Sequence, residues 1–278
     1  MALSISTNVQ SLHANRELAD TSRAHSKTLQ KLSSGDRIST SGDDAASLSI
    51  SEKMKGSIRS YQMAQRNSQD GISIVQVAEG GMQEAQNMLI RLRELSMQAA
   101  SDTLGSEERG YVNVEFQHLK DEIKHIANNT IFGSQHLLNG SGASRDFQIG
   151  IDHDGASTLT FKPEVANILP SALGIQQSDI STKEGARDGL AVIDSAISRV
   201  SSNRAYLGGI QTELHSQLQN IDVHKSNLSD SNSRMRDTDV ATESTKEVTQ
   251  RIRQEAGTAV LAQTNDMPKA VVKLLEKA

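Results

Sequence analysis

Residues 193–235 read IDSAISRVSSNRAYLGGIQTELHSQLQNIDVHKSNLSDSNSRM, and every seventh residue of this stretch is large and apolar. The repeat comprises Ile193, Val200, Leu207, Leu214, Ile221, Leu228 and Met235. Such a repeat is typical of a long helix that packs in the manner of a coiled coil. Its second seam is weaker, because it turns polar along its length: Leu190, Ile197, Arg204, Gln211, Leu218, Lys225 and Asn232. We therefore expect a helix that packs on a few partners without enclosing a full core.

Two segments in the first half of the chain have the matching pattern. The first spaces its apolar residues alternately by three and four, with Ser96 as the exception: Val75, Ala78, Met82, Ala85, Leu89, Leu92 and Ala99. After a break at 101–106, a second segment follows with Glu107 and Glu108 suited to a first helical turn. Its seam is Val112, Phe116, Leu119, Ile123, Ile126 and Thr130, and it is expected to end near 128–133. These helices predict a long antiparallel bundle of three or four members, in which each buried large apolar side chain stabilises by roughly 1.5–3 kcal/mol.

The middle of the chain changes character. Residues 146–152 and 157–162 alternate strand-type residues around turn material at 153–156, which predicts a β-hairpin. Pro163 and Pro170 are expected to end the regular pairing. Residues 181–184 read STKE, which predicts a capping box at the start of the heptad helix.

Composition limits the possible functions. Only 36% of the 278 residues are hydrophobic and 3% aromatic, there is no cysteine, and the net charge of −5 is well mixed, without a basic stripe. Disulfides, thiolate metal sites and nucleic-acid binding therefore have no support. No apolar run is long enough to cross a membrane, and the start MALSISTNVQ does not resemble a cleaved signal peptide.

The two ends of the chain are permissive for helix and poor in apolar residues. Proline is absent from the first 162 residues and occurs once, at Pro268, in the last 107. Ordering some 70 terminal residues costs about 1–2 kcal/mol each in backbone entropy, which their sparse apolar side chains do not offset in a monomer. We expect the ends to be disordered when free and helical once neighbouring copies bury them.

A few motifs raise the question of chemistry. The pairs Glu115/His118 and Glu122/His125 have the Glu-x-x-His spacing of di-iron bundles, but both lie about 10 Å apart on one predicted helix and do not close a two-metal cage. Residues 152–155 are read as a hairpin turn rather than a calcium loop, and the charged run 234–237 is expected on the surface. Residues 139–141 match a glycosylation acceptor in form only. No catalytic, cofactor or metal site is predicted.

Several long motifs resemble those of the bacterial flagellin family. They lie at 32–39 (LSSGDRIS), 42–47 (GDDAAS), 66–81 (RNSQDGISIVQVAEGG), 89–95 (LIRLREL), 193–208 (IDSAISRVSSNRAYLG), 233–243 (SRMRDTDVATE) and 254–265 (QEAGTAVLAQTN). The resemblance covers about four-fifths of the chain. It implies a short flagellin without large outer domains, which is a structural subunit and not an enzyme, and which polymerises with copies of itself into the extracellular filament used for motility.

The resemblance also implies a domain organisation. Residues 1–42 with 238–278 would form an inner core whose terminal helices pair in a tube on assembly, and the turn at 42–44 would link it to the outer bundle. Residues 43–138 with 181–237 would form that bundle, and 139–180 a hairpin and a short variable segment. The expected assembly seams are Ile193, Val200, Leu207, Leu214, Ile221, Leu228, Val271, Leu274 and Leu275.

The same resemblance implies partners. Type III export without a cleaved signal, an export chaperone, a filament cap and hook-associated proteins belong to the family, as does recognition by a vertebrate Toll-like receptor. That face, which is also buried between subunits, would comprise Arg91, Leu95, Gln98 and Glu115. A hook–filament junction protein is the alternative, and a soluble di-iron bundle is a remote second one.

Overall fold

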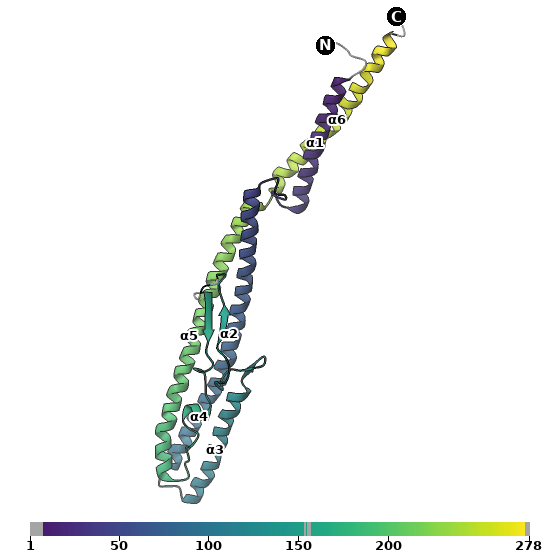
Figure 1. Ribbon diagram of the computed structural model, residues 1–278. Coiled ribbons are helices and arrows are strands. Elements are labelled where there is room, and N and C mark those ends of the chain that lie inside the picture. The colour runs from purple at the N-terminus through teal and green to yellow at the C-terminus, as the bar shows by residue number, and fades with distance from the viewer. Residues whose placement is uncertain (1–7, 153, 155–156, 276–278) are drawn as a thin grey trace. The chain divides into compact units, whose positions relative to one another are not determined.

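The structure is a computed structural model that describes residues 8–152, 154 and 157–275. The chain forms two compact units, each considered by itself: residues 57–226, and residues 1–56 together with 227–278. The long helices α2 (Ala45–Ala99) and α5 (Lys183–Arg236) contribute to both units (Figure 1). The predicted fold class, a mainly helical chain with a small β-hairpin, is confirmed.

Three helices make the larger unit, in which α2 runs antiparallel to both α5 and α3 (Ser106–Asn129) (Figure 1). Arg93 Nε donates to Asp194 at 2.6 Å and Arg204 Nη1 to Gln86 at 2.6 Å, so residue numbers rise along α2 as they fall along α5. The seam predicted for α2 is fully buried, and so are Phe116 and Ile123 of α3. Ser96 is buried as well, because its hydroxyl donates to the Leu92 carbonyl and leaves no unpaired donor.

The predicted hairpin is confirmed, with shorter strands. β3 (Arg145–Gln148) pairs antiparallel with β4 (Thr158–Phe161), in a register that sets Phe147 opposite Leu159. The amides of Ile149 and Gly150 both donate to the Ser157 carbonyl, so the regular ladder ends there. Positions 153, 155 and 156 of the predicted turn lie outside the described residues. Each strand contributes one aromatic side chain to the core: Phe161 is fully buried, and Phe147 packs against the core.

The structure adds two short elements that the sequence pattern did not predict. Strands β1 (Ile131–Phe132) and β2 (Gln135–His136) form a two-residue ribbon, whose turn uses Gly133 with a φ of 64°. Helix α4 (Pro170–Leu173) begins at Pro170, a residue that fits a first helical position because its φ is already fixed. The segment around it fills the core with Ile168, Ile175 and Ile180, which are fully buried.

The start of α5 differs from the predicted capping box by one residue. The helix begins at Lys183, and the hydroxyl of Thr182, rather than that of Ser181, accepts from the Gly185 amide at 3.1 Å. A box on Thr182 would need Glu or Gln at 185, where glycine stands, so the reciprocal half of the motif is absent. The Ser181 amide instead donates to Asp179.

The smaller unit pairs α1 (Val9–Ser34) with α6 (Val240–Leu275) in antiparallel fashion (Figure 1). Asn8 caps the start of α1, because its side chain accepts from the Ser11 amide, and it also donates to the Thr264 carbonyl at 2.8 Å. Farther along the pair, His25 lies 3.2 Å from Glu247. Both terminal segments are therefore helical within one chain, while the predicted dependence of this order on neighbouring copies stays a prediction.

Candidate assembly surfaces and the joint between helix ends

The predicted seam of α5 lies where the sequence placed it. Its first five members are buried in the bundle: Ile193, Val200, Leu207, Leu214 and Ile221. Leu228 and Met235, in the smaller unit, are half-buried, and all seven positions of the weaker seam are half-buried too. Since the first five members face their own chain's core, they hold the subunit together rather than face another subunit. Val271, Leu274 and Leu275 belong to the end of α6, whose side chains lie outside the described ones.

The face predicted for receptor or subunit contact is partly assembled. Arg91 bridges α2 and α3, because its guanidinium lies 2.8 Å from Glu115 and 3.0 Å from Glu94. The hydrogen bond that Arg91 donates to Glu115 raises the pKa of Arg91. Gln98 is exposed beside this cluster on α2. Leu95 differs, since it is only 1% exposed and packs into the bundle core, so its side chain does not reach this face.

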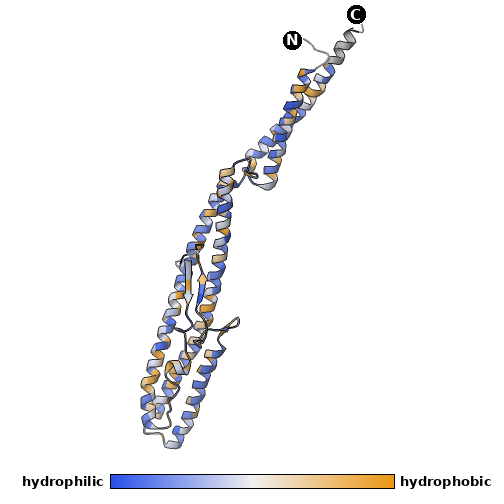
Figure 2. Cartoon of the chain, viewed as in Figure 1, coloured by the Kyte–Doolittle hydropathy of each residue, from blue (hydrophilic) through white to orange (hydrophobic). Residues whose placement is uncertain are grey.

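The α1–α6 pair carries apolar side chains that its own packing leaves exposed. Between two-fifths and three-fifths of each of these residues is exposed: Val9, Leu12, Leu29, Val240, Val248, Ile252, Val260 and Met267. Figure 2 shows hydrophobic residues spaced along both helices among hydrophilic ones. Burying these exposed side chains against another chain would remove their apolar surface from water. This surface is the candidate assembly surface.

At the base of the pair, two linkers run side by side and form the joint of the smaller unit: residues 35–44, and residues 237–239 directly after Arg236, the last residue of α5. Gly35 ends α1 with a φ of 73°, and its carbonyl accepts from the Thr238 amide at 2.8 Å. The Arg37 amide donates to the Arg236 carbonyl at 2.6 Å, and the backbones of Asp36 and Asp237 pair in an isolated antiparallel β-bridge. The two linkers therefore act as a short antiparallel ribbon, which the sequence did not predict.

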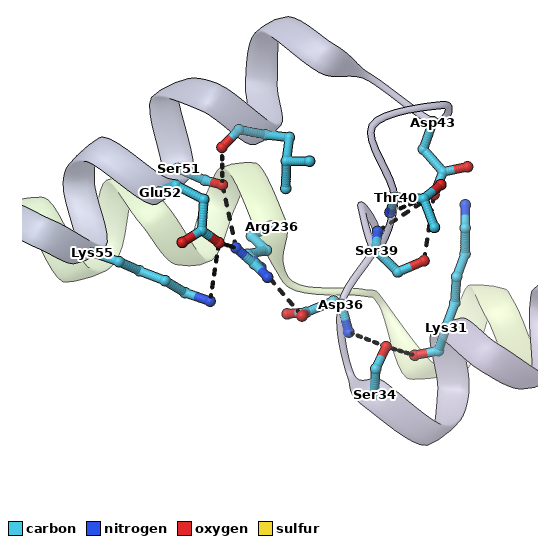
Figure 3. Close-up of polar contacts among 11 residues, drawn as sticks. Lys31, Ser34, Asp36, Ser39, Thr40, Asp43, Ser51, Glu52, Lys55 and Arg236 are labelled. Atoms are coloured by element: carbon cyan, nitrogen blue, oxygen red, sulfur yellow. Dashed lines mark hydrogen bonds and ion pairs between the residues drawn. The ribbon is translucent and has the colours of Figure 1, made fainter.

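Arg236 lies at the centre of this joint. Its side chain is 12% exposed and contacts Glu52 and, at 3.2 Å, Asp36 (Figure 3). The hydrogen bond that Arg236 donates to Glu52 raises the pKa of Arg236. The prediction that residues 234–237 lie on the surface is thus wrong for Arg236, although Arg234 is exposed. Arg236 turns inward because carboxylates of two other segments, Asp36 and Glu52, face it. The local sequence around residue 236 does not reveal these partners.

Asp43 organises the turn that joins α1 to α2. Its carboxylate accepts from the amides and hydroxyls of Ser39 and Thr40 at 3.2–3.4 Å (Figure 3). The same carboxylate pairs with Lys27 of α1. The Lys27 ammonium beside it holds the pKa of Asp43 well below its usual range. The expected turn at 42–44 is therefore present, and a charged side chain fixes it.

The two helices that follow the linkers begin with matching caps. Asp44 accepts from the Ser47 amide at 3.0 Å, and that contact lowers its pKa. Asp239 accepts from the Thr242 hydroxyl at 2.7 Å and from the Ala241 amide at 3.0 Å, which lowers its pKa as well. Both α2 and α6 thus start on an aspartate cap with the negative charge at the positive helix end.

The described residues offer little to metal or membrane chemistry. Within residues 8–152, 154 and 157–275, no three side chains of a kind that binds metal gather at one point. The four residues of the two Glu-x-x-His pairs, Glu115, His118, Glu122 and His125, are each exposed on α3. No helix in that part of the chain is long and apolar enough to cross a membrane.

Comparison with known proteins identifies both halves of the chain. Residues 5–143 match the bacterial flagellin N-terminal helical region, and residues 190–275 match the C-terminal helical region. The flagellin of Halalkalibacterium halodurans is 37% identical over 271 residues, which cover 98% of this chain and 99% of the relative. The flagellin of Bacillus subtilis is 35% identical over 304 aligned positions, again over 98% of this chain.

Solved structures agree with this assignment. The crystal structure of Bacillus cereus flagellin superposes with a TM-score of 0.51 and 27% identity, over 56% of this chain and 88% of that one. A putative flagellar hook-associated protein from Vibrio parahaemolyticus reaches a TM-score of 0.58 over 70% of this chain, but at 13% identity it shares the fold alone. The junction alternative therefore rests on fold likeness, whereas the flagellin assignment rests on sequence over nearly the whole length. The chain belongs to the bacterial flagellin family.

Proposed function

We infer that this protein is a structural subunit of the bacterial flagellar filament, which copies of itself build for motility. The observation that carries this function is the α1–α6 pair, in which large apolar residues such as Leu12, Ile252 and Val260 remain exposed along paired helices. A monomer gains nothing from wet apolar side chains, but a polymer that buries them does. Family membership supplies the kind of polymer.

We propose that the terminal helices, residues 1–42 and 238–278, form the inner core of the filament, and that Val271, Leu274 and Leu275 contribute to its seams. The bundle of residues 43–138 and 181–237 would form the wall around that core, with residues 139–180 facing outward. The antiparallel pairing of α1 and α6 supports this arrangement, because it joins the described parts of both terminal segments in one helical pair. No catalytic role is proposed, since holding a filament together needs only non-covalent contacts.

The family implies further partners and a location that we propose here. The subunit would leave the cell through the flagellar type III apparatus, accompanied by an export chaperone, and would assemble outside between hook-associated proteins and a filament cap. Neither nucleic acid nor membrane is a proposed partner.

We propose that a vertebrate Toll-like receptor recognises the face around Arg91, Gln98 and Glu115, and that this recognition is incidental to the protein's role in assembly. Support comes from the ion pair that fixes Arg91 on Glu115 in an exposed position. Leu95 is left out of this contact set, because burial removes it from the surface. The proposal is tested by measuring receptor activation in reporter cells that are exposed to monomeric protein. A monomer that does not activate the receptor would contradict the proposed recognition and would leave the assembly role unaffected.

Seeded assembly tests the filament function directly. Purified monomer is added to short sheared filament seeds and followed by electron microscopy, with far-ultraviolet circular dichroism recorded on the same samples. Long filaments and a rise in helicity are expected, since the ends gain order on joining. Monomers that persist with unchanged helicity would contradict the filament function and favour a self-sufficient soluble bundle.

A further inference from the structure

Arg236 connects three segments of the smaller unit through one side chain. It is the last residue of α5, and its guanidinium reaches Glu52 in the early turns of α2 and Asp36 in the linker that follows α1 (Figure 3). The Ser51 hydroxyl lies 3.5 Å from the same guanidinium. A planar cation with several donors suits this position, because it can address two carboxylates that come from different directions.

The main chain of the same residue holds the linker as well. The Arg236 carbonyl accepts from the Arg37 amide, and the Arg37 side chain in turn donates to the Met235 carbonyl at 2.7 Å. One residue later, the Thr238 amide donates to Gly35. The last carbonyls of α5, which have no partner inside their own helix, are thus satisfied by the linker after α1.

Burial of the cation distinguishes this cluster from an ordinary surface ion pair: the Arg236 side chain is 12% exposed, against 29% for Asp36 and 57% for Glu52. Exposed pairs contribute little, because water screens them and long side chains must be ordered to form them. Removing the Arg236 side chain therefore leaves the half-buried Asp36 carboxylate without its cation. Arg234, two residues earlier, provides the contrast: it is exposed, and its Nε makes one long contact of 3.4 Å with the Asp230 carbonyl.

We propose that Arg236 is a positioning residue for polymerisation, which clamps the linker 35–44 to the end of α5 and the linker 237–239, so that α1 and α6 leave the joint as one fixed pair. The proposal rests on the filament function proposed above. A subunit whose terminal pair is loose must first adopt the competent arrangement, and its apparent affinity for the filament end falls by the fraction that is competent. The clamp therefore acts on the concentration at which filaments form.

The test compares Arg236→Gln with Arg234→Gln, which removes the same charge two residues away. Two quantities are measured on the full chain: the critical concentration for seeded assembly, and the hydrogen-exchange protection of the Arg37 and Thr238 amides in the monomer. For Arg236→Gln we expect a critical concentration about tenfold higher, as loss of a charge-assisted hydrogen bond implies, and lost protection at both amides. Arg234→Gln is expected to match the wild type in both.

A double-substitution cycle with Glu52→Gln guards against a general effect on folding. If the two residues act through one contact, the double variant assembles about as well as Arg236→Gln alone, while independent effects would multiply. Arg236→Lys keeps the charge without the planar fork and is expected to fall between wild type and Arg236→Gln.

The outcomes separate the clamp from the filament function. Wild-type protein that does not assemble overturns the filament function and the assembly role of Arg236 with it, whereas the exchange data still decide whether the clamp exists. Wild-type assembly together with an unchanged critical concentration in Arg236→Gln, or an equal rise in Arg234→Gln, overturns the positioning role. Independent, multiplying effects in the cycle overturn the contact with Glu52 as its cause.

Discussion

The carboxylate of Asp43 contacts three residues: the ammonium of Lys27, and the amides and hydroxyls of Ser39 and Thr40. Lys27 pairs with it from α1, and Ser39 and Thr40 donate to it from the linker, so its charged form is strongly favoured in the folded chain. Lys27 lowers the pKa of this group below that of an unfolded aspartate, about 3.9. The Asp43 contribution to stability is therefore fully present above that value and is lost as pH falls below it.

Asp43→Asn is expected to loosen the joint at neutral pH and to flatten its response to acid. Hydrogen-exchange protection of the Ser39 and Thr40 amides, which donate to this carboxylate, is the measurement. In the wild type, protection should decline as pH falls below about 4, and in the variant it should be low throughout.

Asp44→Asn is the matched control for this prediction. Asparagine caps a helix about as well as aspartate, so the start of α2 and the amides of Ser39 and Thr40 should keep their protection at neutral pH. Equal losses in both variants would mean that the turn responds to any change of charge, and that the pairing of Asp43 with Lys27 has no special role.

Single residues mark the limit of prediction from this sequence. The buried state of Phe116 and of Leu207 follows from their spacing, because a helix repeats its faces locally. The inward position of Arg236 does not, since its partners Asp36 and Glu52 lie about 200 residues away along the chain. Leu95 shows the reverse error: it directly precedes the seam position Ser96, and its burial in the core excludes the surface role that the family resemblance implied.

At the scale of elements, two adjacent glycines in α2 face different surroundings. A Cβ built on Gly80 meets open space, whereas one built on Gly81 comes within 2.7 Å of both Leu138 and Thr130 side-chain atoms. Leu138 is fully buried, and the Thr130 hydroxyl is engaged with the Ile126 carbonyl, so neither yields easily. Gly81 thus allows the segment after α3 to lie close against α2.

Substituting each glycine by alanine makes this difference measurable. Gly80→Ala should stabilise the chain by about 0.5–1 kcal/mol, since alanine is the better helix former. Gly81→Ala gains the same propensity but forces its neighbours apart, and should be about 1–3 kcal/mol less stable than Gly80→Ala. Denaturant unfolding followed by circular dichroism gives both values, and similar stabilities would show that Leu138 and Thr130 move aside freely.

Long elements were predictable because their signals are periodic and redundant. The helices α2, α3 and α5 each show several turns of apolar spacing, and the hairpin shows alternation on both sides of a turn. The ribbon β1–β2 and the four-residue α4 are too short to show a period. The cap of α5 moved from Ser181 to Thr182 because neighbouring hydroxyl residues offer alternatives that sequence alone does not separate.

At the scale of the whole molecule, apolar residues are distributed unequally. The unit of residues 57–226 encloses nearly all of the core, including every fully buried large side chain among the described residues. The α1–α6 pair orders 26 and 36 residues in its two helices while leaving much of its apolar surface wet. Backbone order at about 1–2 kcal/mol per residue needs compensation from outside the monomer, which neighbouring subunits would provide.

Replacing exposed apolar residues of α6 should therefore impair assembly and spare the monomer. Ile252 is 58% exposed and Val260 51%, and serine has a similar helix propensity to both, so the double variant Ile252→Ser with Val260→Ser should change monomer stability by less than about 0.5 kcal/mol per site. In the filament it forfeits the burial of two side chains, which should raise the critical concentration about tenfold to a hundredfold. Gln263→Ser, an exposed polar position on the same helix, is the control and should assemble like the wild type. Equal critical concentrations for all three proteins would mean that Ile252 and Val260 stay in water after assembly, and that the filament is held by other surfaces.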